Sequence, residues 1–130
     1  KDPTDPKIQK LINKMIETLK NEKGLGLAAP QVGQRVRLCI VECDGELNVL
    51  INPVIKNKSR KKVIMEEGCL SFPGKFYSVS RPEEIKVRHL DEKGNKAKIK
   101  ARGIMSRAIQ HEIDHLDGIL VVDRIKKQKG

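Results

Sequence analysis

The chain has 130 residues, the length of one domain, and its 38% hydrophobic and 34% charged residues are typical of an ordinary globular protein. Lys and Arg outnumber Asp and Glu by 27 to 17, a formal charge of +10 that favours polyanionic partners. With no Trp, one Tyr and two Phe, however, base stacking is excluded as a main mode of recognition, and we interpret the charge as a solvated surface.

Two further features concern membrane spans and disulfide bonds. No apolar run approaches the roughly 20 residues that cross a bilayer, so the sequence predicts no membrane span. Three cysteines at irregular spacing indicate a reduced, intracellular protein and not a disulfide framework.

The first predicted element is an amphipathic helix. Apolar residues recur at helical spacing from Ile8 to Leu19, with Asp5 at the N-cap and Pro6 at the first helical position. Gly24 fits the end of the helix, and the small residues from 24 to 31 predict a loop.

The middle of the chain predicts short strands, with a turn at Asp44–Gly45 and a break at Asn52–Pro53. Residues 84–89 and 96–101 alternate around a turn at 91–95 and predict a hairpin. The other predicted strands are 36–41, 48–51, 62–65 and 119–122.

The last helix is predicted from Ile104 to Leu116 and carries His111-Glu112-Ile-Asp-His115. Its apolar residues lie on more than one side, which indicates a buried helix. At 3.6 residues per turn the two histidines are about 40° apart, so both can reach one metal ion. Glu112 lies beside the pair, where it can handle the proton of a water activated by that metal. On a buried helix, two imidazoles and a carboxylate without a metal would be costly, which argues against a chance match.

A catalytic metal usually has a third protein ligand. No Glu, His or Cys follows His115, so the third ligand must lie upstream. Cys39 fits a small core residue, Cys43 ends its strand without distinguishing neighbours, and we expect His89 to be exposed. Cys69 follows a strand and Gly68, and a thiolate with two imidazoles suits Zn or Fe(II).

Three segments together resemble the peptide deformylase family. The first is a Gly-x-Gly-x-Ala-Ala-x-Gln loop, the second Glu-Gly-Cys-Leu-Ser, and the third Gln-His-Glu-x-Asp-His-Leu-x-Gly. They occur in the family's order from the first helix to the last. Their residues here are Gly24, Gly26, Ala28, Ala29, Gln31, Glu67 to Ser71, and Gln110 through Gly118.

The resemblance implies a role for each matched position. The metal, Fe(II) physiologically with Zn or Ni able to substitute, would be bound by Cys69, His111 and His115. Glu112 would act as general base and then acid. The formyl oxygen would be held by the Gln31 amide and the Leu70 N–H, and the peptide backbone would pair with Leu25, Gly26 and Gly68.

The resemblance also implies the substrate and the fold. We expect removal of the formyl group from the N-terminal formyl-methionine of new polypeptides, with release of formate, in a bacterial-type cytoplasm. The expected fold is α+β: antiparallel or mixed β-sheets around a central buried helix that carries the metal motif, plus the N-terminal amphipathic helix. Residues 1–130 would form one catalytic domain without the segment that usually precedes the family's first helix.

Expected partners are the formyl-methionyl peptide and, through its basic charge, the ribosome surface; a membrane and sequence-specific nucleic acid are not expected. Arg107, one turn before His111, could pair with a nearby carboxylate or line the methionine pocket. Two other functions remain open. One is a zinc peptidase or other amidase, and the other is a basic RNA-binding module with a structural metal.

Overall fold

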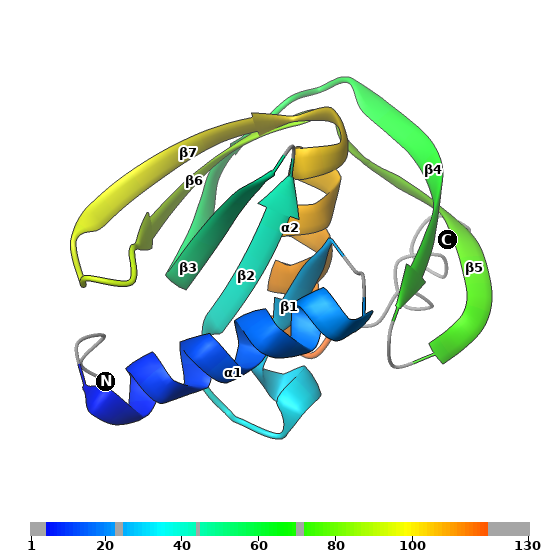
Figure 1. Ribbon diagram of the computed structural model, residues 1–130. Coiled ribbons are helices and arrows are strands. Elements are labelled where there is room, and N and C mark those ends of the chain that lie inside the picture. Colours follow the sequence, from blue (N-terminus) through cyan, green and yellow to red (C-terminus); the bar gives the residue numbers. More distant parts are fainter. Residues whose placement is uncertain (1–4, 23–24, 44, 70–71, 120–130) are drawn as a thin grey trace.

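The computed structural model describes residues 5–22, 25–43, 45–69 and 72–119. Its strands form two antiparallel sheets (Figure 1), one of five strands in the order β1-β2-β3-β6-β7 and one of the two strands β4 and β5. The elements are α1 (Pro6–Glu22), β1 (Gly26–Ala28), the 3-10 turn η1 (Ala29–Val32), β2 (Leu38–Cys43), β3 (Glu46–Lys58), β4 (Lys62–Cys69), β5 (Phe72–Pro82), β6 (Glu84–Leu90), β7 (Lys96–Arg102) and α2 (Gly103–Leu116). The expected α+β class is confirmed.

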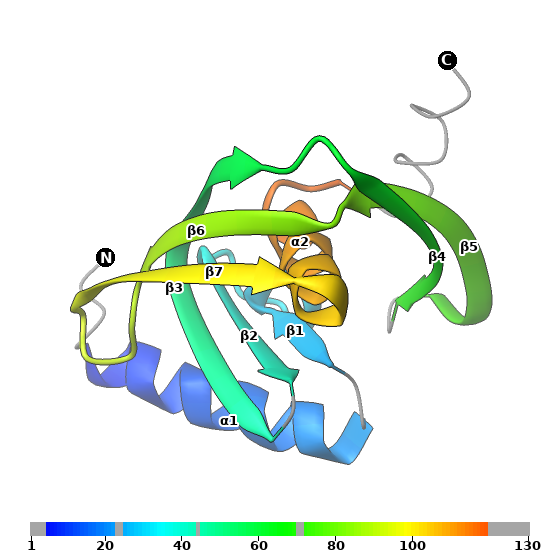
Figure 2. The same cartoon turned by 90° about the horizontal axis from the view of Figure 1, so that it is seen from above.

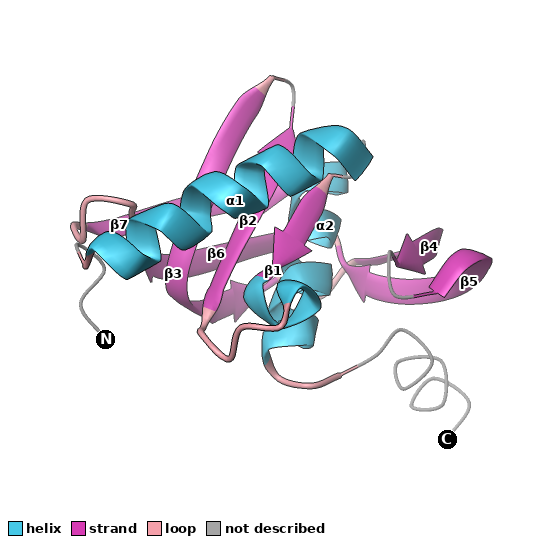
Figure 3. Ribbon diagram, turned by 60° about the horizontal axis from the view of Figure 1, so that its bottom comes forward, coloured by secondary structure: helices cyan, strands magenta, loops and turns pink. Residues whose placement is uncertain are grey.

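The five-stranded sheet separates two apolar cores because successive side chains of a strand point to opposite faces. In β2, Leu38 and Ile40 face α1, whereas Cys39 and Val41 face α2. Helix α1 lies across the strands on one face (Figure 3), where it buries Ile8, Ile12, Met15 and Leu19. Helix α2 covers the other face with Ala108, Ile109 and Ile113.

The start of α1 confirms the predicted cap. The Asp5 carboxylate accepts a hydrogen bond from the Lys7 N–H at 2.9 Å, and the Asp5 carbonyl accepts from Ile8 and Gln9. The predicted stop at Gly24 and the predicted strand 119–122, beyond its first residue, lie outside the described residues.

Helix α2 lies between the five-stranded sheet and the β4–β5 ribbon (Figure 2). It begins at Gly103, whose φ of 63° lets the chain leave β7 and turn sharply into the helix. Near this end, the Gln110 amide donates to the Pro82 carbonyl at 3.0 Å and to the Ser106 hydroxyl at 2.9 Å, which ties α2 to the end of β5. The helix therefore contacts both sheets.

Two predictions about the strands are wrong, and one strand was missed. The expected loop at 24–31 contains β1 and η1, because β1 pairs with β2 at the edge of the sheet. The expected break at Asn52–Pro53 is an irregularity within the continuous strand β3, where Asn52 takes a φ of 53°. Strand β5 was not predicted, since Pro73 and Gly74 interrupt its pattern. The predicted 84–89 and 96–101 hairpin is confirmed as β6 and β7.

Candidate metal centre and active site

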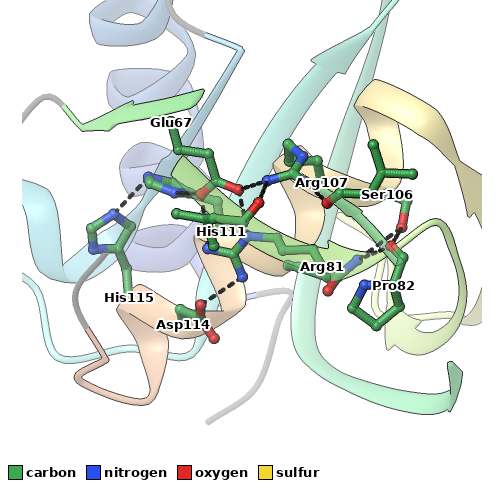
Figure 4. Close-up of polar contacts among 11 residues, drawn as sticks. Glu67, Arg81, Pro82, Ser106, Arg107, His111, Asp114 and His115 are labelled. Carbon is green, nitrogen blue, oxygen red and sulfur yellow. Dashed lines mark hydrogen bonds and ion pairs between the residues drawn. The ribbon is translucent and has the colours of Figure 1, made fainter. Parts of the chain in front are cut away.

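The two motif histidines lie one turn apart on α2 and turn their rings toward one point (Figure 4). The Nε2 atoms of His111 and His115 are 3.1 Å apart, and the ring planes cross at 78°. Two nitrogen atoms at that separation can both lie at the roughly 2.1 Å that is typical of metal–nitrogen bonds from one ion. The pair therefore has the arrangement of a two-histidine chelate.

The other ring nitrogen of His111 is held by β4. Its Nδ1 lies 3.0 Å from Oε1 of Glu67, and both side chains are largely buried. A carboxylate at Nδ1 fixes the hydrogen on that atom, so the Nε2 lone pair faces the other histidine. Burial raises the pKa of Glu67, but the hydrogen bonds with His111 and Arg81 outweigh it and lower the pKa to about 2. Glu67 is therefore ionised in the folded protein near neutral pH.

Glu67 is also the centre of a buried ion network that joins three elements (Figure 4). Arg81 of β5 donates to Glu67 at 2.5 and 2.8 Å and to Asp114 of α2 at 2.8 Å. Arg107 of α2 donates to Glu67 and to the Val79 carbonyl at 3.0 Å. The same carboxylates raise the pKa of Arg81, although its burial acts in the opposite direction.

This network balances its own charge, because two buried arginines face two buried carboxylates. Burying ions costs several kcal/mol each, and only such close pairing offsets that cost. Of the two roles considered for Arg107, pairing with a carboxylate near the site is the one that the contacts support. The arginines thus lock Glu67 against His111 and dock β4–β5 onto α2.

The donor set fits a divalent metal, within what the structure describes. The converging Nε2 atoms and the carboxylate behind His111 are typical of metal-binding histidines. Among the side chains that are described, no group of three or more His, Cys, Asp or Glu forms a metal cage. The side chain of the expected third ligand, Cys69, is outside that set. Its backbone ends β4 two residues after Glu67.

Glu112 follows His111 on α2, and its side chain lies against the edge strand β1. It is 4% exposed, and a methyl group built on Gly26 would approach its Cγ to 2.8 Å and its Oε2 to 2.9 Å. Only a residue without a side chain lets the backbone of β1 come this close. Gly26 therefore sets the position of the Glu112 carboxylate.

Gln31 closes the turn after β1. Its side-chain oxygen accepts a hydrogen bond from the Ala28 N–H at 2.8 Å, as the reaching-back residue of a capping box does. This contact engages the acceptor half of the amide and so assigns its NH₂ half to donation. Gln31 is partly buried in η1.

Strand β1 is an edge of the five-stranded sheet. The Leu25 carbonyl accepts from the Glu42 N–H at 2.7 Å, and polar groups along an antiparallel strand alternate between its two sides. The Gly26 N–H and C=O accordingly point to the outer edge. Gly68 lies in β4 before a register shift, and Leu70 is outside the described residues.

The remaining ligand candidates are distinguished by burial. Cys39 is fully buried in the core beneath α2, and burial together with the Glu112 carboxylate raises the pKa of its thiol, so it is a core residue as predicted. The side chain of Cys43 is not among those described. The expectation that His89 is exposed is wrong: it is 6% exposed on β6, with Nδ1 2.9 Å from the Leu90 carbonyl.

Sequence reasoning missed the positioning roles of Glu67, Arg81 and Asp114. Glu67 was noted only as part of a motif, and Asp114 only as a residue between the histidines. The sequence did indicate that such partners exist. A buried helix with four charged or imidazole side chains at positions 110–115 requires polar partners from other parts of the chain.

Comparison with known proteins agrees with this geometry. A family model described as polypeptide deformylase matches residues 1–130. The peptide deformylase of Picosynechococcus is 47% identical over 129 residues, covering 95% of this chain and 69% of the relative. That of Thermodesulfovibrio yellowstonii is 50% identical over 127 residues, covering 94% and 76%.

The solved structures give the same result. The crystal structure of peptide deformylase from Thermotoga maritima superposes with a TM-score of 0.90 at 39% identity, covering 93% of this chain and 82% of that one. None of the helices in the described part of the chain is long and apolar enough to cross a membrane. By sequence and by fold, this chain belongs to the peptide deformylase family of hydrolases.

Proposed function

We propose that this chain removes the formyl group from the N-terminal formyl-methionine of newly synthesised polypeptides, in a metal-dependent hydrolysis that releases formate. The family removes N-formyl groups from nascent peptides and consists of metalloenzymes. The observation that supports the proposal best is the convergence of the His111 and His115 Nε2 atoms at 3.1 Å, with Glu67 behind His111. This arrangement is costly unless a metal is bound there.

The proposed ligands are His111, His115 and Cys69. Two imidazoles and one thiolate leave a coordination position for chemistry, as catalytic sites require. When bound, the metal supplies Lewis acidity, which polarises the formyl carbonyl and lowers the pKa of water in the site. Fe(II) is the native ion that the resemblance to the family implies, and Zn or Ni can substitute because all three accept these donors.

Glu112 is the proposed proton carrier. It takes a proton from the attacking water and returns it to the departing amide nitrogen. The C–N bond then breaks, and the products are formate and a free amino terminus. The close contact with Gly26 supports this role, because it restricts where the Glu112 carboxylate can lie against β1.

Gln31 and Leu70 are proposed to stabilise the formyl oxygen as its charge grows. Gln31, whose amide oxygen accepts from Ala28, donates through its NH₂ group, and Leu70 donates its N–H. The peptide backbone is proposed to pair with Leu25, Gly26 and Gly68. Among these, Gly26 has its N–H and C=O on the open edge of β1, where an extended peptide can add as a strand, whereas the Leu25 carbonyl is bonded to the Glu42 N–H of β2.

Three further expectations remain predictions: iron as the native metal, a cytoplasmic location, and contact with the ribosome surface. That residues 1–130 form a single catalytic domain also remains a prediction. None of them is needed for the assay that tests the proposed reaction.

The test is formate release from formyl-Met-Ala-Ser by protein loaded anaerobically with Fe(II) or with Ni. We expect turnover that is abolished by chelation and restored by metal. Glu112→Gln should retain the metal and lose roughly 10²- to 10⁴-fold in kcat, the usual contribution of a general acid–base group.

Glu66→Gln is the matched control, since it removes an exposed carboxylate from β4 and should leave turnover unchanged. Metal-loaded protein that leaves the formyl peptide intact would refute the proposal. Cleavage of an internal bond in an unformylated peptide would instead support the peptidase alternative.

A further inference from the structure

The sheet face opposite α2 is covered over only part of its width. Helix α1 packs over Leu38, Ile40, Val49 and Ile51 and reaches Leu90 at the end of β6. Farther along β6 and β7, the side chains on this face are exposed. We call these residues the basic face: Lys86, Arg88, Lys96, Lys98, Lys100 and Arg102.

The ladder between β6 and β7 places like charges directly opposite each other. Lys86 is paired with Lys100, and Arg88 with Lys98. Such cross-strand pairs lower stability, and proteins usually alternate them with opposite charges. On the other side of β6, Arg88 and Lys86 pair with Val54 and Asn57 of β3, so neither residue has a carboxylate opposite it on a neighbouring strand.

Most of these cations have no ion partner among the described residues. Arg102 forms an exposed ion pair with Glu84 at 3.5 Å. The other five form no ion pair with any carboxylate in the ranges that the structure describes. The buried arginines Arg81 and Arg107, by contrast, each face a carboxylate.

Protection of a sheet edge against pairing explains the cations on only one of the two strands. Lysines on an edge strand discourage pairing with other chains, and β7 is an edge strand. Lys86 and Arg88, however, are on β6, which has neighbours on both sides. A partner that contacts both strands would account for the cations on β6 as well as those on β7.

We propose that the basic face binds the phosphate backbone of double-stranded RNA without reading its sequence. From Lys96 to Arg102 alternate residues extend over about 20 Å, and the two strands lie about 4.8 Å apart, so the face matches an extended polyanion and not a single small anion. It has no aromatic side chain for base stacking, which leaves phosphate contacts as the mode of binding.

An anionic membrane fits this face less well. Surface-bound elements insert apolar side chains between headgroups, whereas beside these rows the described part of the chain exposes one large apolar side chain in β3, that of Val54. The choice of RNA over DNA rests on the proposed function, since the substrate is a polypeptide leaving an RNA-rich particle. The metal site is on the α2 side of the sheet, so RNA bound to the basic face leaves it open (Figure 2).

The test compares two variants of the full chain that lose four positive charges each. The first changes the two like-charged pairs to glutamine: Lys86→Gln, Arg88→Gln, Lys98→Gln and Lys100→Gln. The control changes four exposed cations outside the face: Lys10→Gln, Lys14→Gln, Lys20→Gln and Arg35→Gln. Binding to a fluorescent RNA hairpin with a fully paired stem is measured by anisotropy across a salt series.

We expect the wild type to bind with a steep salt dependence. The first variant should lose about 0.9 from the slope of log K against log salt for each lost phosphate contact, and at least about tenfold in affinity near 0.1 M salt. The control should lose less than about threefold. Both variants should keep wild-type formate release and an unchanged or higher melting temperature, which separates lost binding from unfolding.

Three results would overturn the proposal. They are absence of RNA binding by the wild type near 0.1 M salt, equal loss in both variants, and binding to phosphatidylserine vesicles without binding to RNA. Tighter binding to a DNA duplex of the same sequence would overturn the choice of RNA. Failure of formate release would count against the proposed function alone, because RNA binding is measured separately.

Discussion

The buried site on α2 and the basic face of β6–β7 both concentrate charged side chains, but they differ in whether opposite or like charges face each other. At the site, Arg81 and Arg107 face Glu67 and Asp114, and the contacts cross three elements. On the basic face, Lys86 and Arg88 face other cations across the ladder. Buried charges need partners to exist at all, whereas exposed cations can remain without one at a small cost. The buried network therefore holds side chains of the site in position, whereas the basic face leaves its positive charge available to a partner.

The largest expected effect comes from breaking the buried network. Arg81→Met should lower the free energy of unfolding by about 3–5 kcal/mol, because it leaves the Glu67 and Asp114 carboxylates buried without their counterion. Arg102→Met, which removes an arginine that is 74% exposed, should cost under about 1 kcal/mol. Urea unfolding followed by circular dichroism measures both. Similar losses in the two variants would contradict the distinction between buried and exposed charge.

Gly26→Ala tests the placement of Glu112. The added methyl group would meet Glu112 Cγ at 2.8 Å, so the carboxylate or β1 has to move. A displacement of about 1 Å can cost on the order of 10²-fold in rate, and we expect kcat to fall by about that factor with the metal content unchanged.

The effect of Gly26→Ala should nearly vanish in the Glu112→Gln background, where the proton carrier is already lost. An additive loss in the double variant would show that Gly26 acts through something other than Glu112.

Glu67→Gln tests whether the network orients His111. Loss of the carboxylate behind a metal-binding histidine typically weakens metal affinity by about 10- to 100-fold. Glu66→Gln changes the neighbouring, exposed carboxylate and should leave the affinity unchanged. Competition with a chromophoric chelator measures both dissociation constants. Equal metal affinities for the two variants would show that Glu67 does not orient His111 for metal binding.

The smallest effect is expected on the basic face. Lys100→Glu converts the pair with Lys86 from like to opposite charge and should raise the free energy of unfolding by about 0.2–1 kcal/mol. Lys96→Glu is the control, because its cross-strand partner is Leu90. A gain from Lys96→Glu as large as that from Lys100→Glu would mean that only net charge matters.

The regular parts of the fold could be predicted from sequence where local patterns were strong. The helix from Pro6 and the hairpin of β6 and β7 carry clear periodicity and caps. Strand β5 could not be found this way, because Pro73 and Gly74 interrupt it and its pairing with β4 is what makes it a strand. Asn52–Pro53 was misjudged for a similar reason, since the sheet carries β3 through the irregularity.

The site, like the fold, could be predicted where a local pattern in the sequence determines it. The helical spacing of His111 and His115 indicates their proximity, because it depends on one element only. The roles of Glu67, Arg81 and Arg107 depend on β4, β5 and α2 meeting, with contacts between residues up to 44 positions apart. Burial of His89 was missed because alternation along β6 was not applied to its last positions.

The most direct test of the central claim is cobalt substitution followed by absorption spectroscopy. A Cys69 thiolate bound to Co(II) gives a sulfur-to-metal charge-transfer band in the near ultraviolet, which imidazole and carboxylate ligands do not give. We predict one Co(II) per chain with this band in the wild type and in Glu112→Gln, and no band in Cys69→Ser. A band that persists in Cys69→Ser, or a wild type that binds no Co(II), would contradict a metal centre built from Cys69, His111 and His115.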